Sequence, residues 1–212
     1  DQRSKEICKS IIQKRINKEM DYSDLAKEVS QQYFDDEIVS CQINESFVDA
    51  GAFDGATSVE FAKWAKKGYE KIVIYEPMKE NIVNVEHTVR NLKNVEIHNK
   101  ALWNKKELLQ FSFDGAGSSV DENGITVEAE PLDPDSKVTF VKMDIEGAEM
   151  NALEGMKSII MEQKPKLAIC IYHLYDDLWN IPKYIHELVP EYKLYMRHYS
   201  KINEETVIYA IL

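Results

Sequence analysis

Residues 46–55 read SFVDAGAFDG, and this stretch decides the fold. Its first half is a short apolar strand that ends at Asp49, and its second half is a turn that contains Gly51 and Gly55. Glycine lets the backbone turn tightly and approach a ligand where a Cβ would clash. Residues 57–67 then follow a helical pattern, which turns unpaired N–H groups and a positive dipole end toward the turn. A strand, a glycine turn and a helix in this order predict the first unit of a doubly wound α/β fold.

Strands and helices continue to alternate on either side of this unit. Helix 79–91 lies between strands 71–75 and 95–98, at the spacing of right-handed βαβ units. Residues 108–113 and 125–130 alternate like exposed antiparallel strands and predict a hairpin-like insertion. The remaining predicted elements are strands 138–144, 167–172, 192–197 and 206–212 and helices 148–162 and 177–188. We therefore expect one mostly parallel α/β domain with an antiparallel finish.

The N-terminal segment precedes the first strand and has a helical pattern of its own. Residues 5–33 predict helices, with an isoleucine stripe at positions 7, 11, 12 and 16, and with Leu25 and Val29 after a capping signal at Ser23. We expect a helical extension over residues 1–45 and the main α/β domain over residues 46–212. The stripe suits packing within the chain or a dimer contact, so the oligomeric state stays open.

Composition excludes several classes of partner. The formal net charge is −11, whereas a surface that follows phosphates needs clustered Lys and Arg, so no nucleic acid is expected. No apolar stretch approaches the roughly 18 residues that span a bilayer, so no membrane partner is expected either. Cys8, Cys41 and Cys170 lie far apart and without a CxxC pair, which suits a reducing compartment and predicts a cytoplasmic protein.

Glu76, at the end of the second predicted strand, indicates a nucleoside ligand. A carboxylate there is placed to accept hydrogen bonds from ribose hydroxyls. The turn lacks the G-x-G-x-x-G spacing of dinucleotide folds, and Asp49 and Asp54 would repel a pyrophosphate but suit a cationic amino-acid ligand. D-x-G-x-x-x-G followed by the ribose acid is similar to the first two motifs of class I methyltransferases. A nicotinamide-dependent oxidoreductase and a catalytically inactive cofactor-binding module are the alternatives.

Further motifs make the resemblance more specific. Residues 46–212 resemble the FkbM family of methyltransferases in Phe47–Ala52, Tyr75–Pro77, Gly117–Ser119, Lys142–Glu149, Ile171–His173 and Arg197-His198. The resemblance implies S-adenosylmethionine as methyl donor and a hydroxyl acceptor on a carbohydrate or polyketide-like small molecule. It also implies a seven-stranded sheet whose last strand is antiparallel.

The resemblance also assigns cofactor-binding roles. It implies that the Asp49, Gly51 and Gly55 loop holds the methionine part of the cofactor and that Glu76 binds the ribose. Ala101, just after the third strand, matches the adenine-contact region, and Ser118 or Ser119 is placed to close over the cofactor, although a simple turn would explain these serines equally well.

Acceptor chemistry is expected at the ends of the fourth and fifth strands of the fold. Asp144 follows the fourth, next to the methyl donor in this fold class, so we expect it to contact both cofactor and acceptor. Asp144 and Glu146 are candidates to orient or deprotonate a hydroxyl, although acids there also cap a helix. His173 ends the fifth strand and is a third catalytic candidate. These three side chains could bind Mg²⁺, but their spacing does not demand a metal, and none is assigned.

Overall fold

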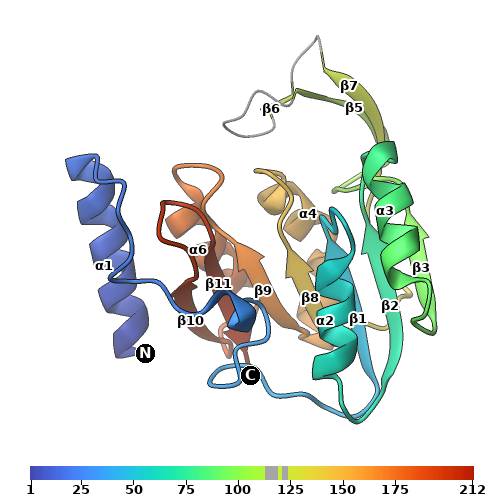
Figure 1. The fold of residues 1–212 in the computed structure, drawn as a ribbon, viewed down its shortest axis with the longest axis horizontal. Helices are drawn as coiled ribbons and strands as arrows, with labels where there is room; N and C mark the ends of the chain where they lie inside the picture. The colour runs from blue at the N-terminus through green and yellow to red at the C-terminus, as the bar shows by residue number, and fades with distance from the viewer. Residues whose placement is uncertain (113–118, 121–123) are drawn as a thin grey trace.

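The computed structural model describes residues 1–112, 119–120 and 124–212, and its centre is a seven-stranded sheet (Figure 1). The strand order is β10-β11-β9-β8-β1-β2-β3. β11 runs antiparallel to β9 and β10, and the pairs among β9, β8, β1, β2 and β3 are parallel. The strands are β1 (Glu45–Ala50), β2 (Tyr69–Tyr75), β3 (Val95–His98), β8 (Phe140–Met143), β9 (Lys166–Cys170), β10 (Lys193–His198) and β11 (Thr206–Ile211). This topology confirms the predicted doubly wound sheet with an antiparallel last strand.

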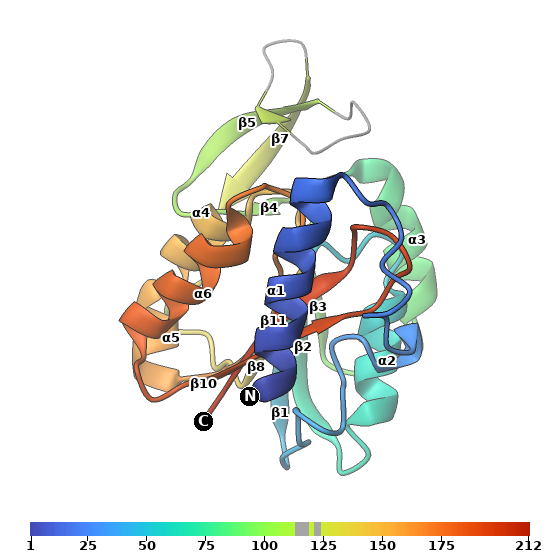
Figure 2. The same ribbon diagram turned by 90° about the vertical axis from the view of Figure 1, so that its left-hand side faces the viewer.

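Helices cover both faces of the sheet (Figures 1 and 2). One face packs against α1, α4, α5 and α6 through a core that includes Ile7, Leu153 and Ile181. The other face packs against α2 and α3 through a core that includes Phe61 and Val85. The helices are α1 (Gln2–Asn17), α2 (Ala56–Trp64), α3 (Lys79–Val89), α4 (Glu149–Gly155), α5 (Lys157–Gln163) and α6 (Asp177–Leu188), with a short 3-10 helix η1 (Val29–Gln31). No helix in the described ranges is both long and apolar enough to cross a bilayer.

A second, smaller sheet confirms the predicted insertion. Its order is β4-β7-β5-β6, and β5 pairs antiparallel with β7. The strands are β4 (Ala101–Leu102), β5 (Glu107–Ser112), β6 (Ser119–Val120) and β7 (Ile125–Glu130). Figure 1 shows this sheet beyond the end of the main sheet where α3 begins.

The N-terminal segment is less helical than predicted. α1 matches the first part of the prediction, but in residues 25–33 η1 alone is helical. The backbone N–H of Lys27 donates to the His198 carbonyl at 2.9 Å, and the N–H of Tyr33 donates to the Tyr209 hydroxyl at 3.0 Å. These tertiary hydrogen bonds replace those of a local helix, and the side chain of Val29 is 66% exposed.

The helix predicted over residues 148–162 is also divided. α4 ends at Gly155 and α5 begins at Lys157, with the buried Met156 between them. Glycine at this point lowers helix propensity, and the Met156 N–H is shared between the carbonyls of Ala152 and Leu153. The break keeps both short helices on the same face of the sheet.

Candidate functional site

The candidate site lies where β1, β2, β8 and β9 end side by side. The Gly51 N–H donates to the Tyr75 carbonyl at 2.9 Å, and the Asp144 N–H donates to the Ala50 carbonyl at 3.1 Å. Gly51 has φ +77°, and a Cβ there would lie 1.8 Å from the Asp144 carbonyl oxygen. Glycine is therefore required at position 51 because the turn after β1 contacts the chain that leaves β8.

Asp49 is buried beneath this turn. Its Oδ2 accepts a hydrogen bond from the Ser58 hydroxyl at 2.7 Å, and its Oδ1 lies 3.2 Å from Nζ of Lys142. Lys142 is also buried, and its Nζ donates to the Gly51 carbonyl at 2.5 Å. Burial alone would lower the pKa of Lys142, but the charge of Asp49, followed by that of Asp144, outweighs it and raises the pKa. Asp49 thus supports the glycine turn through Lys142, which begins the Lys142–Glu149 motif but had no predicted role.

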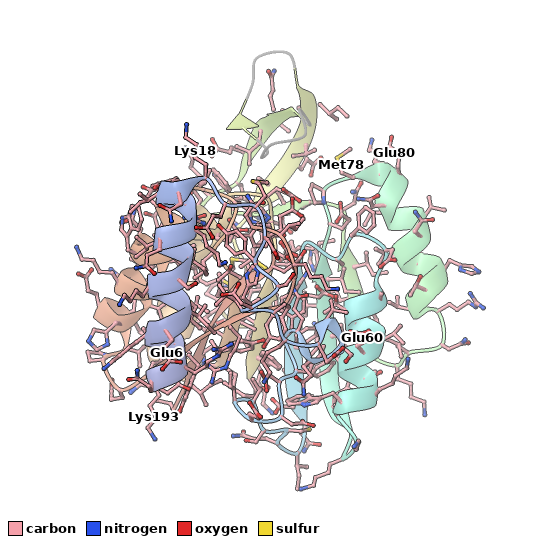
Figure 3. The ribbon with its side chains drawn as sticks, turned by 60° about the vertical axis from the view of Figure 1, so that its left-hand side comes forward. Glu6, Lys18, Glu60, Met78, Glu80 and Lys193 are labelled. Atoms are coloured by element: carbon pink, nitrogen blue, oxygen red, sulfur yellow. The ribbon has the colours of Figure 1, made fainter. Side chains whose placement is uncertain are left out.

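Glu76 is buried at the end of β2 with a carboxylate that accepts three hydrogen bonds. They come from the backbone N–H of Phe53 and of Met78, both at 2.9 Å, and from the side-chain amide of Asn81 at 3.2 Å. Since a carboxylate offers about four lone-pair positions, capacity remains for a ligand hydroxyl. Glu76 therefore joins the turn after β1 to the start of α3, where Figure 3 labels Met78 and Glu80.

The other predicted cofactor residues lie in different settings. Gly55 precedes α2 with φ +82°, and a Cβ there would lie 3.3 Å from Cα of Val85 in α3, so it serves close packing of the two helices. Ala101 is buried in β4 within the small core of the second sheet. Ser118 lies outside the described residues. Asn99, which was not predicted, donates from its side chain to the Glu76 carbonyl at 3.0 Å.

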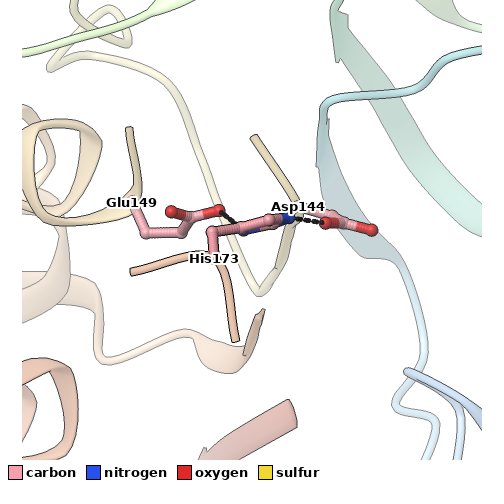
Figure 4. Close-up of side chains that lie close together, drawn as sticks. All are labelled: Asp144, Glu149 and His173. Atoms are coloured by element: carbon pink, nitrogen blue, oxygen red, sulfur yellow. Dashed lines mark hydrogen bonds and ion pairs between the residues drawn. The ribbon is translucent and has the colours of Figure 1, made fainter. Parts of the chain in front are cut away.

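The predicted catalytic acids Asp144 and Glu146 lie beside the ring of His173, and a third acid, Glu149, joins them. Figure 4 shows His173 between Asp144 and Glu149. Nδ1 of His173 lies 2.8 Å from Oε1 of Glu149, which also accepts the Ile145 N–H at 2.9 Å. Nε2 lies 3.3 Å from Oδ1 of Asp144 and 3.6 Å from Oε2 of Glu146. Glu149 was part of the Lys142–Glu149 motif but had no predicted role.

Electrostatics gives these groups different protonation states. Burial alone would lower the pKa of His173, but the Glu149 hydrogen bond and the surrounding carboxylates outweigh it and raise the pKa to about 9. Burial also opposes ionisation of Asp144, yet the charges of Lys142 and His173 lower its pKa. Burial raises the pKa of Glu146. At neutral pH the ligand-free site therefore holds an imidazolium between carboxylates, and this imidazolium cannot accept a proton.

Two tyrosines also bind the carboxylate of Asp144. The Tyr33 hydroxyl donates to Oδ2 at 2.8 Å, and the Tyr172 hydroxyl donates to Oδ1 at 3.2 Å. Tyr33 belongs to the N-terminal segment, outside the motifs that pointed to the site. Its left-handed backbone, with φ +66°, gave no signal in the sequence. Hence residues before β1 help to form this end of the sheet.

Comparison with solved structures supports the fold. The chain is similar to a crystal structure of methyltransferase FkbM from Methylobacillus flagellatus, with a TM-score of 0.78 and 27% identity over 90% of this chain and 49% of that chain. A precorrin-6y C5,15-methyltransferase from Geobacter metallireducens has a TM-score of 0.53 at 12% identity, covering 84% of this chain and 95% of that one. A SAM-dependent methyltransferase from Aquifex aeolicus has a TM-score of 0.50 at 16% identity, covering 89% and 95%. The last two similarities show the fold alone.

Sequence comparison identifies the family. No curated protein matches the chain significantly. The chain spans about half the length of the Methylobacillus flagellatus protein. The family model of the FkbM methyltransferase domain matches residues 49–201, which include the end of β1, all of β2, β8 and β9, and all the predicted site residues. The chain therefore belongs to the FkbM methyltransferase family.

Proposed function

We propose that this chain transfers a methyl group from S-adenosylmethionine to a hydroxyl of a small molecule. The convergence of Asp144, Glu146 and His173 beside the Gly51 turn carries the proposal, because it joins an acid–base cluster to a nucleoside-type site in an FkbM domain. In doubly wound sheets, ligands bind outside the carboxyl ends of the strands at this kind of position.

The residues present fit the proposed cofactor. Glu76 has room for a ribose hydroxyl, and the exposed Asp54 and the carboxylate cluster favour a cation over a pyrophosphate. S-adenosylmethionine supplies an electrophilic methyl group on a positively charged sulfonium. The Asp49–Lys142 pair keeps the Gly51 turn in place, so the cofactor loop is formed before ligand arrives.

The acceptor is proposed to lie against Asp144 and Glu146. Methyl transfer to oxygen is an in-line displacement, so the chain must mainly align the hydroxyl and exclude water. A carboxylate within hydrogen-bond reach accepts the hydroxyl proton as the O–C bond forms. Asp144 is fixed by Tyr33 and Tyr172 and suits the orienting role, whereas Glu146, 60% exposed, is accessible for proton transfer. His173 positions both carboxylates.

A small-molecule acceptor agrees with the surface around the site. Tyr175 and Trp179 follow His173 along the chain, are 65% and 48% exposed, and meet edge to face at 5.8 Å between ring centroids. Such rings stack on sugars or planar compounds. The net charge of −11 disfavours a nucleic-acid acceptor. We therefore propose a carbohydrate or polyketide-like hydroxyl compound.

Calorimetric titration of the purified chain with S-adenosylmethionine, S-adenosylhomocysteine and NAD⁺ tests the cofactor. We expect binding of the first two and none of NAD⁺. Glu76→Gln should weaken binding about tenfold or more, as expected for a lost bond to a charged group. Glu80→Gln is the matched control, since Glu80 is exposed in the first turn of α3 (Figure 3). Binding of NAD⁺ alone would support an oxidoreductase instead, and binding of none of the three would support an inactive module.

Transfer itself is tested with methyl-labelled S-adenosylmethionine and a panel of sugars and polyketide-like alcohols. His173→Gln should slow transfer while S-adenosylhomocysteine affinity is retained, because His173 contacts the acceptor-side carboxylates. An unchanged rate with a true acceptor would remove His173 from the catalytic group.

A further inference from the structure

The His173 ring has one nitrogen that is bound and one that is not. Nδ1 contacts the fully buried Glu149 at 2.8 Å. Nε2 has no hydrogen-bond partner among the described residues, although the side chain is only 4% exposed. A buried polar atom without a partner is rare, and it commonly marks a place where an ion or ligand belongs.

Nε2 faces two carboxylate oxygens at distances that do not suit charged hydrogen bonds. Such bonds are about 2.7–2.9 Å long, whereas Nε2 lies 3.3 Å from Asp144 and 3.6 Å from Glu146. The distances suit ligands of one metal ion instead. With metal–ligand bonds of about 2.1 Å, two ligand atoms lie about 3.0 Å apart at a right angle and about 3.4 Å apart at the tetrahedral angle.

From this geometry we propose that His173 Nε2, Asp144 and Glu146 bind a divalent metal ion. Glu149 then has the usual role of a carboxylate behind a metal-binding histidine: it accepts the Nδ1 hydrogen and fixes the ring orientation. The Ile145 N–H holds the same Glu149 oxygen at 2.9 Å, so the histidine is oriented by a group that is itself fixed. The remaining coordination positions are left for water or an acceptor oxygen.

The backbone turns Glu146 toward this position. Glu146 and Gly147 both have left-handed conformations, with φ +58° and +89°. A non-glycine residue in this region is unfavourable and is retained where the surrounding structure requires it. The turn directs the Glu146 carboxylate back to His173 although the residue lies at the surface.

The ligand chemistry favours a first-row transition metal. Imidazole is a poor ligand for Mg²⁺ and Ca²⁺, while two carboxylates make the site harder than a typical zinc site. Mn²⁺ is therefore a suitable probe, and it should bind more tightly than Mg²⁺. Within the proposed function, such an ion would take the acceptor hydroxyl and lower its pKa. Metal binding itself is independent of methyl transfer.

Another group of side chains offers a competing location. One ligand atom each from Asp144, Cys170 and Glu205 lie within 4.8 Å of one another, as do those of Asp144, Glu149 and His173. The Cys170 sulfur lies 3.5 Å from the Tyr33 hydroxyl, and Glu205 accepts a hydrogen bond from Gln32. Cys170 and Glu205 thus have partners already, unlike Nε2 of His173, which makes their group the weaker candidate.

The experiment is a titration of the metal-free full chain with Mn²⁺ alone, followed by the loss of the free-ion EPR signal. We expect one ion per chain, Glu146→Gln to weaken binding at least tenfold and His173→Gln to abolish it. Glu149→Gln should weaken binding about 10–100-fold, as substitutions behind a metal-binding histidine do. Because Glu146 is exposed, its variant tests the site without risk to the fold.

Glu205→Gln is the control and should leave Mn²⁺ affinity unchanged. The proposal is overturned if the wild-type chain binds no Mn²⁺ at millimolar concentration, or if Glu146→Gln and His173→Gln bind like wild type. It is also overturned if Glu205→Gln alone abolishes binding, which would place the ion at Cys170. Since no S-adenosylmethionine is present, none of these outcomes bears on methyl transfer.

Discussion

Lys142 provides the sharpest test of how the site is held together. Its Nζ lies 3.2 Å from Oδ1 of Asp49, and the two side chains are 3% and 0% exposed. It also donates to the carbonyls of Ala50 and Gly51 at 3.3 and 2.5 Å. Lys142→Met keeps most of the aliphatic volume but removes the charge and these donors, and it leaves the Asp49 carboxylate buried beside the Ser58 hydroxyl.

Two estimates give the size of the effect. Unit charges 3.2 Å apart interact by about 5 kcal/mol at an effective dielectric constant of about 20. Breaking a buried ion pair by removing one partner costs about 3–5 kcal/mol in measured cases. We therefore expect Lys142→Met to lower the free energy of unfolding by about 3–5 kcal/mol. Adding Asp49→Asn removes the unpaired charge, so the double variant should recover about half of that loss.

Urea unfolding followed by tryptophan fluorescence and circular dichroism measures both variants. Lys164→Met is the control, because Lys164 pairs with Glu191 at the surface and should lose less than about 1 kcal/mol. The reasoning fails if Lys142→Met costs less than about 1 kcal/mol. It fails equally if the losses from Lys142→Met and Asp49→Asn simply add in the double variant, since that would show no coupling between the charges.

Three further outcomes follow from single positions. Gly51→Ala should prevent stable folding, because its Cβ would overlap the Asp144 carbonyl oxygen. Gly68→Ala is the control: Gly68 also has a positive φ, +89°, but no atom lies within 4 Å of the new Cβ. Urea unfolding of this control should show a loss of only about 1 kcal/mol from backbone strain. Burial, aided by the charge of Glu149, raises the pKa of Asp177 to about 6, so the native chain binds its proton more tightly than the unfolded chain and stability falls as pH rises from about 4 to 6. Asp177→Asn should therefore raise the unfolding free energy by about 2 kcal/mol at pH 8 and have little effect at pH 3.5, and an equal gain at both values would refute the pKa assignment. Ser58→Ala should cost about 1.5–3 kcal/mol, the value of a buried hydrogen bond to a charged group, and a loss below 0.5 kcal/mol would show that Asp49 does not depend on it.

Local pattern was enough to predict the strands and the edge on which the site lies. Asp49, Glu76, Asp144 and His173 each follow an apolar run, and such runs are visible in the sequence without knowledge of their partners. The strand order is a long-range property, and the family resemblance implied only a seven-stranded sheet with an antiparallel last strand. The predicted catalytic residues do meet in space, but their roles stay predictions.

What the sequence could not reveal were pairings between distant residues. Lys142 lies inside an apolar strand pattern, and its burial depends on Asp49, 93 positions earlier. Tyr33 reaches Asp144 because tertiary hydrogen bonds, and not a helix, shape residues 25–33. A lysine in a predicted strand suggests a solvent-facing position, and a tyrosine in a predicted helix suggests a core position. Neither local pattern therefore points to a functional site.

The net charge of the site links the proposed methyl donor to the proposed metal ion, because both are cations. The carboxylates of Asp49, Asp144, Glu146 and Glu149 face the cations Lys142 and His173, so negative charge is in excess. That excess favours the sulfonium of S-adenosylmethionine over the neutral thioether of S-adenosylhomocysteine. A divalent ion on Nε2 of His173 would replace the imidazolium proton and reduce this excess by one charge, so saturating Mn²⁺ should weaken binding of S-adenosylmethionine more than that of S-adenosylhomocysteine.

Calorimetry with and without Mn²⁺ measures this ratio of affinities, and Glu146→Gln, which loses the ion, should restore the metal-free ratio in the presence of Mn²⁺. If the chain binds Mn²⁺ but the ratio of the two affinities does not change, the charge of the ion does not act on the bound sulfonium. The metal would then lack a role at the acceptor oxygen. A ratio that shifts as expected would place the cation within about 10 Å of the sulfonium, because charges farther apart in solvent are largely screened.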